Sequence, residues 1–437
     1  MSYPVRIALI AALGGLLFGF ETAVISGAEQ TLQKLWDLSS GWLGFTVASS
    51  LIGTVLGSLI AGVPAKQYGR KKVLTGIAVL YLLSALGCAL TPSWILFIFF
   101  RFLGGVAVGA SSVVGPMYIS EIAPAHLRGR LAGSFQINVV AGILLAYLTN
   151  YLVRGVGEDS WRWMLGIMVV PSAIFAILVR TIPESPRWLV LNGREGEALP
   201  IMQRVGEANI EKAIADIRTS VASHTEKLFQ SKYAKPITLA VVLAMFNQLA
   251  GINAIIYYAP RIFSMAGLTG SSAFLAPVFM GLANFLFTLF AMNFIDRFGR
   301  RTLLIIGSLG MIVFLALTAL AFRDPNATDK NVIIYLIGFI AFFAFSQGAV
   351  IWVFISEIFP NSVRSQGGSL GSFTHWIMAA IISWTFPIIV ESSPKGGFYS
   401  FIFYCIMMVL HLIFAWKFLP ETKGRSLEEI QKELGIE

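Results

Sequence analysis

The sequence has little charge and almost no cysteine. Charged residues make up 13% of its 437 residues, whereas 56% are hydrophobic and the mean hydropathy is +0.76. A soluble domain carries about twice that share of charge, and one or two cores cannot bury so much apolar surface. The composition therefore excludes a soluble globular protein and a disordered chain. Cys88 and Cys405 both lie in apolar runs, which excludes a disulfide framework and a cysteine-based metal cluster.

The sequence is rich instead in continuous apolar runs of about 20 residues, the length that a helix needs to cross a bilayer. Outer-membrane barrels are excluded, because their strands alternate in polarity over about ten residues. We therefore predict an all-α membrane protein with twelve transmembrane helices. Only Arg6 precedes the first run and no small-residue cleavage site follows it, so we interpret this run as a span and not as a signal peptide. The spans are expected at roughly 6–28, 42–64, 73–91, 94–118, 131–153, 162–182, 236–259, 272–294, 302–322, 331–356, 367–390 and 397–419.

The 32 Lys and Arg residues are distributed unevenly around these spans. If both termini lie on the inner side, as an even number of spans requires, the inner segments carry 24 of them and the outer segments seven, with Arg101 inside a span. Inner loops of membrane proteins are enriched in Lys and Arg. The count therefore predicts a multi-pass protein of the cell membrane with its termini and central loop in the cytoplasm. It also accounts for the net charge of +9 without nucleic acid, which we do not expect as a partner.

The second half of the sequence repeats motifs of the first half in the same order. Three pairs recur at offsets of 230 to 237 residues: Tyr68–Lys71 with Phe298–Arg301, Ile119–Arg128 with Ile355–Arg364, and Pro183–Ser185 with Pro420–Thr422. Two parallel six-helix halves are a transporter architecture with the substrate site between them at the midplane. We expect an N-terminal bundle at 1–182, a cytoplasmic linker with short amphipathic helices at 183–235, a C-terminal bundle at 236–419 and a cytoplasmic tail at 420–437.

Six motifs together resemble the sugar porter family of the major facilitator superfamily, which includes bacterial sugar–proton symporters and animal glucose facilitators. The resemblance covers nearly the whole chain. The motifs are Gly14–Gly27, Tyr68–Lys71, Pro183–Trp188, Asn247–Asn253, Asp296–Arg301 and Pro420–Glu428. The resemblance implies the major facilitator fold and transport of a monosaccharide without a cofactor or a metal. We expect a monomer embedded in lipid.

Away from the ends of the expected spans we find one acid, Glu21, and one base, Arg101. Each costs about 2.5–3.5 kcal/mol at the centre of a bilayer, so the two residues are expected to face a cavity or each other. A nearby guanidinium favours the ionised carboxylate, whereas its removal favours the neutral acid. Motion of the halves could therefore couple proton binding at Glu21 to conformation. Proton symporters of the family have an Asp here and passive facilitators an uncharged residue, so the acid favours symport.

The expected sugar site combines neutral amides with aromatic rings, because a sugar presents many hydroxyl groups and apolar faces. Gly251 permits a helix break that would let the amides on either side of it line one cavity. The resemblance implies sugar contact for Gln136, Asn247, Gln248, Asn253, Asn284, Trp352, His375 and Trp376, and places Phe18 and Tyr257 near the ligand. The chain departs from the family's amide pattern at Ile143, Asn247, His375 and Ala379, so it is expected to recognise a different set of hydroxyls.

Acids and bases recur at matching loop ends on the cytoplasmic side. We expect them to pair across spans and between halves and so to close the inside in one state. The residues assigned to this cytoplasmic gate are Arg70, Lys71, Glu121, Arg128, Glu184, Arg300, Arg301, Glu357 and Arg364.

Three other functions compete with a proton-coupled symporter. A passive sugar uniporter would keep Glu21 and Arg101 as a structural pair. A membrane sensor is disfavoured, because the central loop contains no recognisable output domain. A membrane enzyme is disfavoured, because the spans contain no paired carboxylates, no Ser–His–Asp set and no metal cluster at helical spacing.

Overall fold

The computed structural model describes residues 2–124, 127–219, 226–324, 328–425 and 427–436. In this part of the chain every regular element is a helix. Twelve helical segments are long and apolar enough to cross a membrane, which confirms the expected all-α class and the number of spans. The first segment runs from Tyr3 to Leu35 and is therefore longer than the sequence indicates.

Six spans form the N-terminal half. The sixth span is interrupted and consists of two α-helices and a short 3-10 helix. The helices of this half are α1 (Tyr3–Leu35), α2 (Ser40–Ile60), α3 (Gly62–Tyr68), α4 (Arg70–Leu90), α5 (Trp94–Ile122), α6 (Arg128–Val153), α7 (Ser160–Gly166), α8 (Val169–Leu178) and η1 (Val179–Thr181).

The other six spans form the C-terminal half, in which the seventh and tenth spans are broken. The helices of this half are α12 (Ala234–Leu249), α13 (Ile252–Tyr257), α14 (Ala259–Met265), α15 (Ser271–Phe298), α16 (Arg300–Ala321), α17 (Val332–Phe345), α18 (Gln347–Glu357), α19 (Arg364–Ser392) and α20 (Gly396–Lys417).

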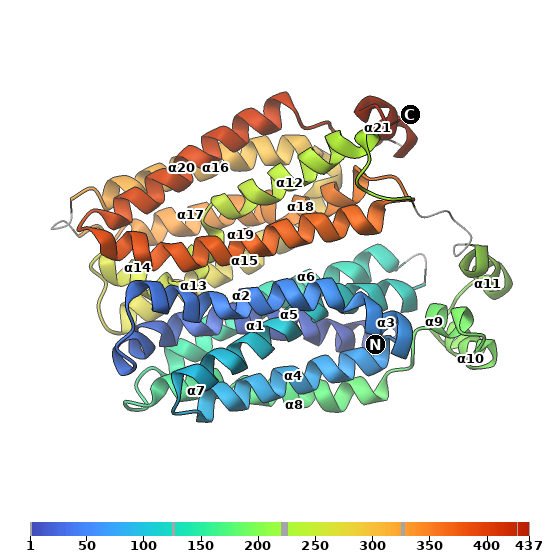
Figure 1. Cartoon of the computed structure of the whole chain (residues 1–437), viewed down its shortest axis with the longest axis horizontal. Helices are drawn as coiled ribbons and strands as arrows, with labels where there is room; N and C mark the ends of the chain where they lie inside the picture. Colours follow the sequence, from blue (N-terminus) through green and yellow to red (C-terminus); the bar gives the residue numbers. More distant parts are fainter. Residues whose placement is uncertain (1, 125–126, 220–225, 325–327, 426, 437) are drawn as a thin grey trace.

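The linker and the tail contribute short helices outside the bilayer-length segments: α9 (Pro186–Leu191), α10 (Glu195–Val205), α11 (Ile210–Thr219) and α21 (Leu427–Leu434). The short 3-10 helix η2 (Ser231–Tyr233) begins the seventh bilayer-length segment. Helices α9–α11 and α21 lie at the same end of the molecule as both chain termini (Figure 1). This placement agrees with the even number of spans.

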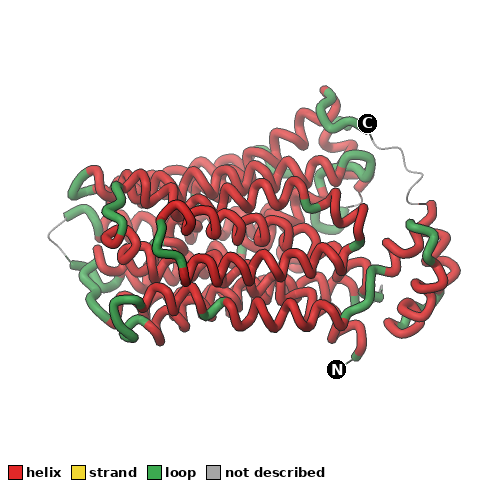
Figure 2. The backbone as a smooth tube through the Cα atoms, turned by 60° about the horizontal axis from the view of Figure 1, so that its bottom comes forward, coloured by secondary structure: helices red, strands yellow, loops and turns green. Residues whose placement is uncertain are grey.

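The two halves lie one above the other with their helices roughly along the long axis of the molecule (Figures 1 and 2). They contact each other along α2 and α19 and along α6 and α15. Within the N-terminal half, α2 and α5 approach closely because glycines face backbone. A Cβ atom on Gly105 would lie 1.8 Å from the carbonyl oxygen of Ser50, and one on Gly53 would lie 2.2 Å from that of Phe102. Gly53 and Gly105 therefore allow the two helices to pack closely.

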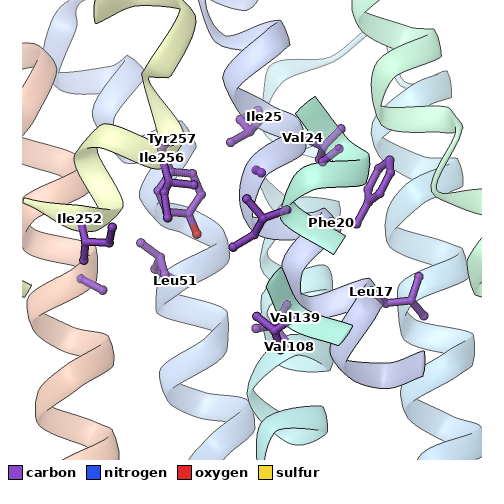
Figure 3. Close-up of a cluster of buried hydrophobic side chains, with 14 of the residues drawn as sticks. Leu17, Phe20, Val24, Ile25, Leu51, Val108, Val139, Ile252, Ile256 and Tyr257 are labelled. Atoms are coloured by element: carbon purple, nitrogen blue, oxygen red, sulfur yellow. The ribbon is translucent and has the colours of Figure 1, made fainter. Parts of the chain in front are cut away.

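Both broken spans change direction next to polar residues. Gly251 has a left-handed backbone (φ +82°) between α12 and α13, so the helix break that this glycine permits is present. The tenth span breaks at Ser346 (φ −117°, ψ −91°), between α17 and α18. The segment after Gly251 packs its apolar side chains against the N-terminal half. Figure 3 shows Ile252, Ile256 and Tyr257 near residues of α1 and α2 in a buried cluster.

Candidate functional site

A cavity of about 460 Å³ lies between the two halves. Its wall combines α1, α5 and α6 of the N-terminal half with α12, α13, α15, α17, α18 and α19 of the C-terminal half. Volumes of about 300–1,000 Å³ are typical of small-molecule sites. The two helix breaks bring the ends of four short helices to this wall, so polar side chains from both sides of each break can face one space.

Three amides of the seventh span form a hydrogen-bonded chain on the cavity wall. Asn253 donates from Nδ2 to Oε1 of Gln248 (2.7 Å), and Gln248 donates from Nε2 to Oδ1 of Asn247 (2.9 Å). All three side chains are at least nine-tenths buried. Their mutual bonds fix the orientation of each amide, so the remaining donors and acceptors present a defined pattern to a ligand.

Aromatic rings from both halves face the same space. His375 lies between the rings of Trp352 (4.9 Å between centroids) and Trp376 (4.8 Å), and Phe18 lies 5.6 Å from Trp376. The amide nitrogen of Gln248 lies 3.2 Å from Nε2 of His375. The aromatic group is therefore joined to the amide chain, as a site for a ring with hydroxyl edges and apolar faces requires.

Of the ten residues expected at the sugar site, nine line this cavity. They are Phe18, Gln136, Asn247, Gln248, Asn253, Asn284, Trp352, His375 and Trp376. Tyr257 does not belong to the lining and is 2% exposed within the apolar cluster of Figure 3. Ile143, which stands where the family often has a glutamine, also lines the cavity, so this part of the wall is apolar.

Glu21 and Arg101 form an ion pair inside the N-terminal half. Arg101 donates from Nη1 to Oε1 of Glu21 (2.5 Å), and the exposed fractions of the two residues are 0% and 3%. Thr22, the next residue in α1, lines the cavity, so the pair lies directly behind its wall. Within the described residues no group of three His, Cys, Asp or Glu side chains could hold a metal ion.

The expected gate residues of the N-terminal half form one cluster. Arg70 binds Glu121 through two hydrogen bonds of 2.8 Å. Glu184 accepts from the backbone N–H groups of Arg70 (2.9 Å) and Lys71 (3.1 Å) and thus caps the start of α4. Gly69 (φ +97°) is required here, because a Cβ atom would lie 2.3 Å from the carboxylate of Glu184.

The C-terminal half repeats this cluster with different residues. Arg300 donates from Nη2 to Oε1 of Glu357 (2.8 Å), and Glu421 accepts from the backbone N–H groups of Arg300 (2.8 Å) and Arg301 (3.1 Å). Sequence reasoning assigned no gate role to Glu421, although the repeated Pro-Glu motif could have indicated it.

These ionic contacts join spans of one half and do not join the halves. Arg364 donates to the backbone oxygen of Phe359 (3.3 Å), also within its own half, and Arg128 is exposed. Each of these contacts therefore joins spans of a single half, and the gate role of these residues stays a prediction. The pairs Arg70–Glu121 and Arg300–Glu357 each lie within one half, on the side of the termini.

An ion network at the opposite end does join the halves, and the sequence did not indicate it. Because α1 continues to Leu35, Glu29 is a second acid of the first span and is fully buried. Arg261 of α14 donates to both carboxylate oxygens of Glu29 (3.0 and 2.7 Å), to Gln33 (2.5 Å) and to Glu391 of α19 (2.7 Å). The expectation of one acid and one base within the spans is therefore wrong. A longer estimate of the first span would have included Glu29.

The architecture and the cavity define a multi-pass transporter of two parallel halves, and comparison with known proteins identifies its family. Residues 7–434 match the family model described as sugar (and other) transporter. The chain is 36% identical to the D-xylose-proton symporter of Escherichia coli, covering 98% of this chain and 95% of that protein. It is 35% identical to the arabinose-proton symporter of Bacillus subtilis, covering 99% and 95%.

The structure also resembles the inward-open conformation of the xylose transporter XylE from E. coli. The TM-score is 0.88 at 35% identity, over 99% of this chain and 100% of that chain. The chain belongs to the sugar porter family of the major facilitator superfamily.

Proposed function

We propose that the protein carries a monosaccharide, a hexose or a pentose, across the membrane together with a proton by alternating access. Relatives described as proton symporters of D-xylose and of arabinose support this proposal. The observation that carries it is the buried pair of Glu21 and Arg101 behind the cavity wall. A carrier that moves sugar alone has no evident need for an ionisable carboxyl group in the bilayer.

In the proposed cycle Glu21 holds the proton and Arg101 controls its release. The guanidinium stays protonated, so the carboxyl group is the partner that can change its charge. At the present distance of 2.5 Å the ionised carboxylate is favoured by its partner. Movement of α1 away from α5 would leave that carboxylate in a medium of low dielectric, where the neutral acid is favoured. Proton uptake then accompanies the conformational change.

The proposed sugar contacts are the amides and rings of the cavity wall. The chain from Asn253 through Gln248 to Asn247 supplies donors and acceptors for hydroxyl groups, and Trp352 and Trp376 supply apolar faces. Gln136 and Asn284 extend the polar surface to α6 and α15. His375 acts as a neutral hydrogen-bonding group, because the proton of the symport cycle is assigned to Glu21.

Alternating access requires that the two ends of the cavity open in turn. The Arg261 network joins the halves at the end away from the termini, whereas the gate pairs at the other end lie within single halves. The excess of Lys and Arg on the side of the termini supports a cytoplasmic position for that side. We therefore propose that this conformation is closed to the outside and that the halves separate toward the cytoplasm.

A passive sugar uniporter is the alternative. In that case Glu21 and Arg101 form a static pair, which is often no more stable than apolar packing of the same volume. The two proposals differ in whether sugar entry acidifies the receiving compartment. A pH rise in a lightly buffered external medium on addition of sugar supports the symporter.

The decisive experiment compares wild type with Glu21→Gln in proteoliposomes, using labelled D-xylose, arabinose and glucose as probes. We expect the variant to lose accumulation driven by an imposed proton gradient but to retain counterflow, in which labelled sugar exchanges at equilibrium. Ser26→Ala is the matched control, since this buried hydroxyl bonds within its own helix (2.7 Å to the Ala23 oxygen). Retained accumulation in Glu21→Gln would remove the proton role of this residue.

A further inference from the structure

A second buried polar cluster lies behind the cavity in the C-terminal half. His411 of α20 is fully buried, and its Nδ1 atom lies 2.7 Å from Oγ of Ser308 in α16. The same nitrogen lies 3.2 Å from the amide nitrogen of Gln347, the first residue of α18. Three helices therefore meet through polar side chains at one imidazole nitrogen. Neither the sugar site nor the proton pair described above includes this cluster.

The cluster is connected to the sugar site through the backbone of Gln347. Asn247 donates from Nδ2 to the carbonyl oxygen of Gln347 (3.4 Å), while its Oδ1 atom accepts from Gln248 (2.9 Å). A continuous path of polar contacts thus runs from Ser308 through His411 and Gln347 to the amides of the cavity wall. His411 itself is not part of that wall, so it has no direct contact with a ligand there.

The cluster also lies at the break of the tenth span. Ser346 interrupts the helix, so some backbone N–H and C=O groups near the break lack their regular helical hydrogen bonds. Gly307 of α16 packs against this point so closely that a Cβ atom would lie 1.8 Å from Oγ of Ser346. Gly348 and Trp352, which follow the break, line the cavity. Whatever holds Gln347 in place therefore also sets the direction in which Trp352 enters the cavity.

We propose that His411 is a positioning residue for sugar binding. Nδ1 of the neutral imidazole can accept one hydrogen bond from Nε2 of Gln347 and so anchors that side chain to α20. Gln347 in turn holds the Asn247 amide and the start of α18 in the geometry that the sugar requires. Without the imidazole, a buried amide at a helix break would have to find other partners, which costs free energy and moves the break. This inference rests on the proposed transport of a monosaccharide.

The test measures uptake kinetics for His411→Leu and His411→Asn against wild type, with the sugar among D-xylose, arabinose and glucose that wild type transports. Leucine removes both ring nitrogens, whereas the amide of asparagine places a polar atom near the Nδ1 position. We expect His411→Leu to raise the KM for sugar about threefold to tenfold, the effect of losing one buried hydrogen-bonding group. The maximal rate per folded molecule should change less than twofold, and His411→Asn should restore most of the affinity.

Ser400→Ala is the matched control, because Ser400 is a buried polar residue of the same helix whose hydroxyl bonds to the Gly396 oxygen (3.0 Å). It should leave the KM unchanged. Should His411→Leu fail to fold, Ser308→Ala removes one partner of the imidazole, and a smaller rise in KM is expected. The stabilisation of each folded variant by added sugar, measured as a shift in Tm, reports binding independently of transport.

The outcomes separate this inference from the proposed function. If wild type neither transports nor is stabilised by any of the three sugars, the proposed function fails. If wild type transports a sugar and His411→Leu keeps its KM, or if His411→Asn restores affinity no better than leucine, the positioning role of His411 is wrong while the sugar transporter remains.

Discussion

Gly104 lies where α5 passes the Glu21–Arg101 pair, and its lack of a side chain makes room for that pair. A Cβ atom at this position would lie 2.4 Å from Oγ of Ser84 and 2.8 Å from Oε1 of Glu21. Both distances are shorter than non-bonded contacts allow. The carboxylate can therefore reach Arg101 only because residue 104 is glycine.

We expect Gly104→Ala to uncouple sugar movement from the proton gradient. The methyl group must displace the carboxylate of Glu21 from Arg101, at a cost of about 1–3 kcal/mol for overpacking a buried site. The ratio of accumulated to external sugar under a proton gradient should fall several-fold, while counterflow continues. Ser49→Ala is a suitable control, because this buried residue of α2 bonds to its own helix (2.8 Å to the Thr46 oxygen) and does not line the cavity. Full accumulation in Gly104→Ala would show that the close approach is not needed.

Individual site residues were predictable from the sequence where their chemistry is unusual for a membrane. An acid and a base in apolar runs are rare, and so are clustered amides, so these residues indicate a site. The structure places Glu21 beside Arg101 and the amides on the cavity wall. Glu29 was missed for the opposite reason. It lies near polar residues that look like a loop, and only the full length of α1 shows that it is buried.

At the scale of elements, the paired motifs of the two halves build helix starts. Glu184 and Glu421 cap α4 and α16 by accepting from backbone N–H groups, where the helix dipole also favours a negative charge. Gly69 and Gly299 both adopt a left-handed backbone to admit those carboxylates. The repeated Gly-Arg and Pro-Glu motifs are thus two parts of one cap, separated by more than a hundred residues in the chain.

Gly69→Ala is therefore expected to destabilise the protein far more than an alanine elsewhere in the same region. The substitution strains the backbone and meets the Glu184 carboxylate at 2.3 Å, for a combined cost of about 2–4 kcal/mol. Gly76→Ala is the matched control, since residue 76 lies in α4 with nothing within 4 Å of its Cβ position. Thermal unfolding in detergent should show a lower Tm for Gly69→Ala and no loss for Gly76→Ala. Equal values of Tm would contradict the capping role of this motif.

The two helix breaks differ in how far the sequence indicates them. Gly251 lies between Gln248 and Asn253, and glycine adopts a left-handed backbone without strain, so the sequence indicated where a break was possible. The break at Ser346 has no proline or positive φ to mark it. It depends on contacts with Gly307 and on the anchoring of Gln347, which are far apart in the sequence. Local patterns do not contain that information.

At the scale of the whole molecule, the internal repeat predicts two similar halves but not how they meet. Each half contains its own gate cluster, so the repeated motifs form equivalent contacts inside the two halves. The contact between them is asymmetric. The Arg261 network joins them at one end, and its members Glu29, Gln33 and Glu391 belong to no repeated motif. The conformation of the molecule therefore depends on residues that the repeat does not reveal.

We expect this network to hold the transporter closed to the outside. Arg261 donates to both carboxylate oxygens of Glu29. Hydrogen bonds between charged groups contribute about 1.5–3 kcal/mol each to the stability of the contact when they are buried. Glu29→Gln weakens the contact while keeping its shape, and Arg261→Gln leaves two acids facing each other without a cation. Both variants should shift the population toward an outward-open state by about tenfold.

The shift can be measured in whole cells with Thr22→Cys, a cavity-lining position, and a maleimide that does not cross membranes. Cys88 and Cys405 are buried and contribute little background. Labelling from outside should be about tenfold faster in the Glu29→Gln and Arg261→Gln backgrounds. Asp159→Asn is the control, because it breaks the more exposed Asp159–Arg162 pair (3.2 Å), which lies within one half. Equal labelling rates in all backgrounds would mean that contacts other than this network, such as those of α2 with α19, keep the outside closed.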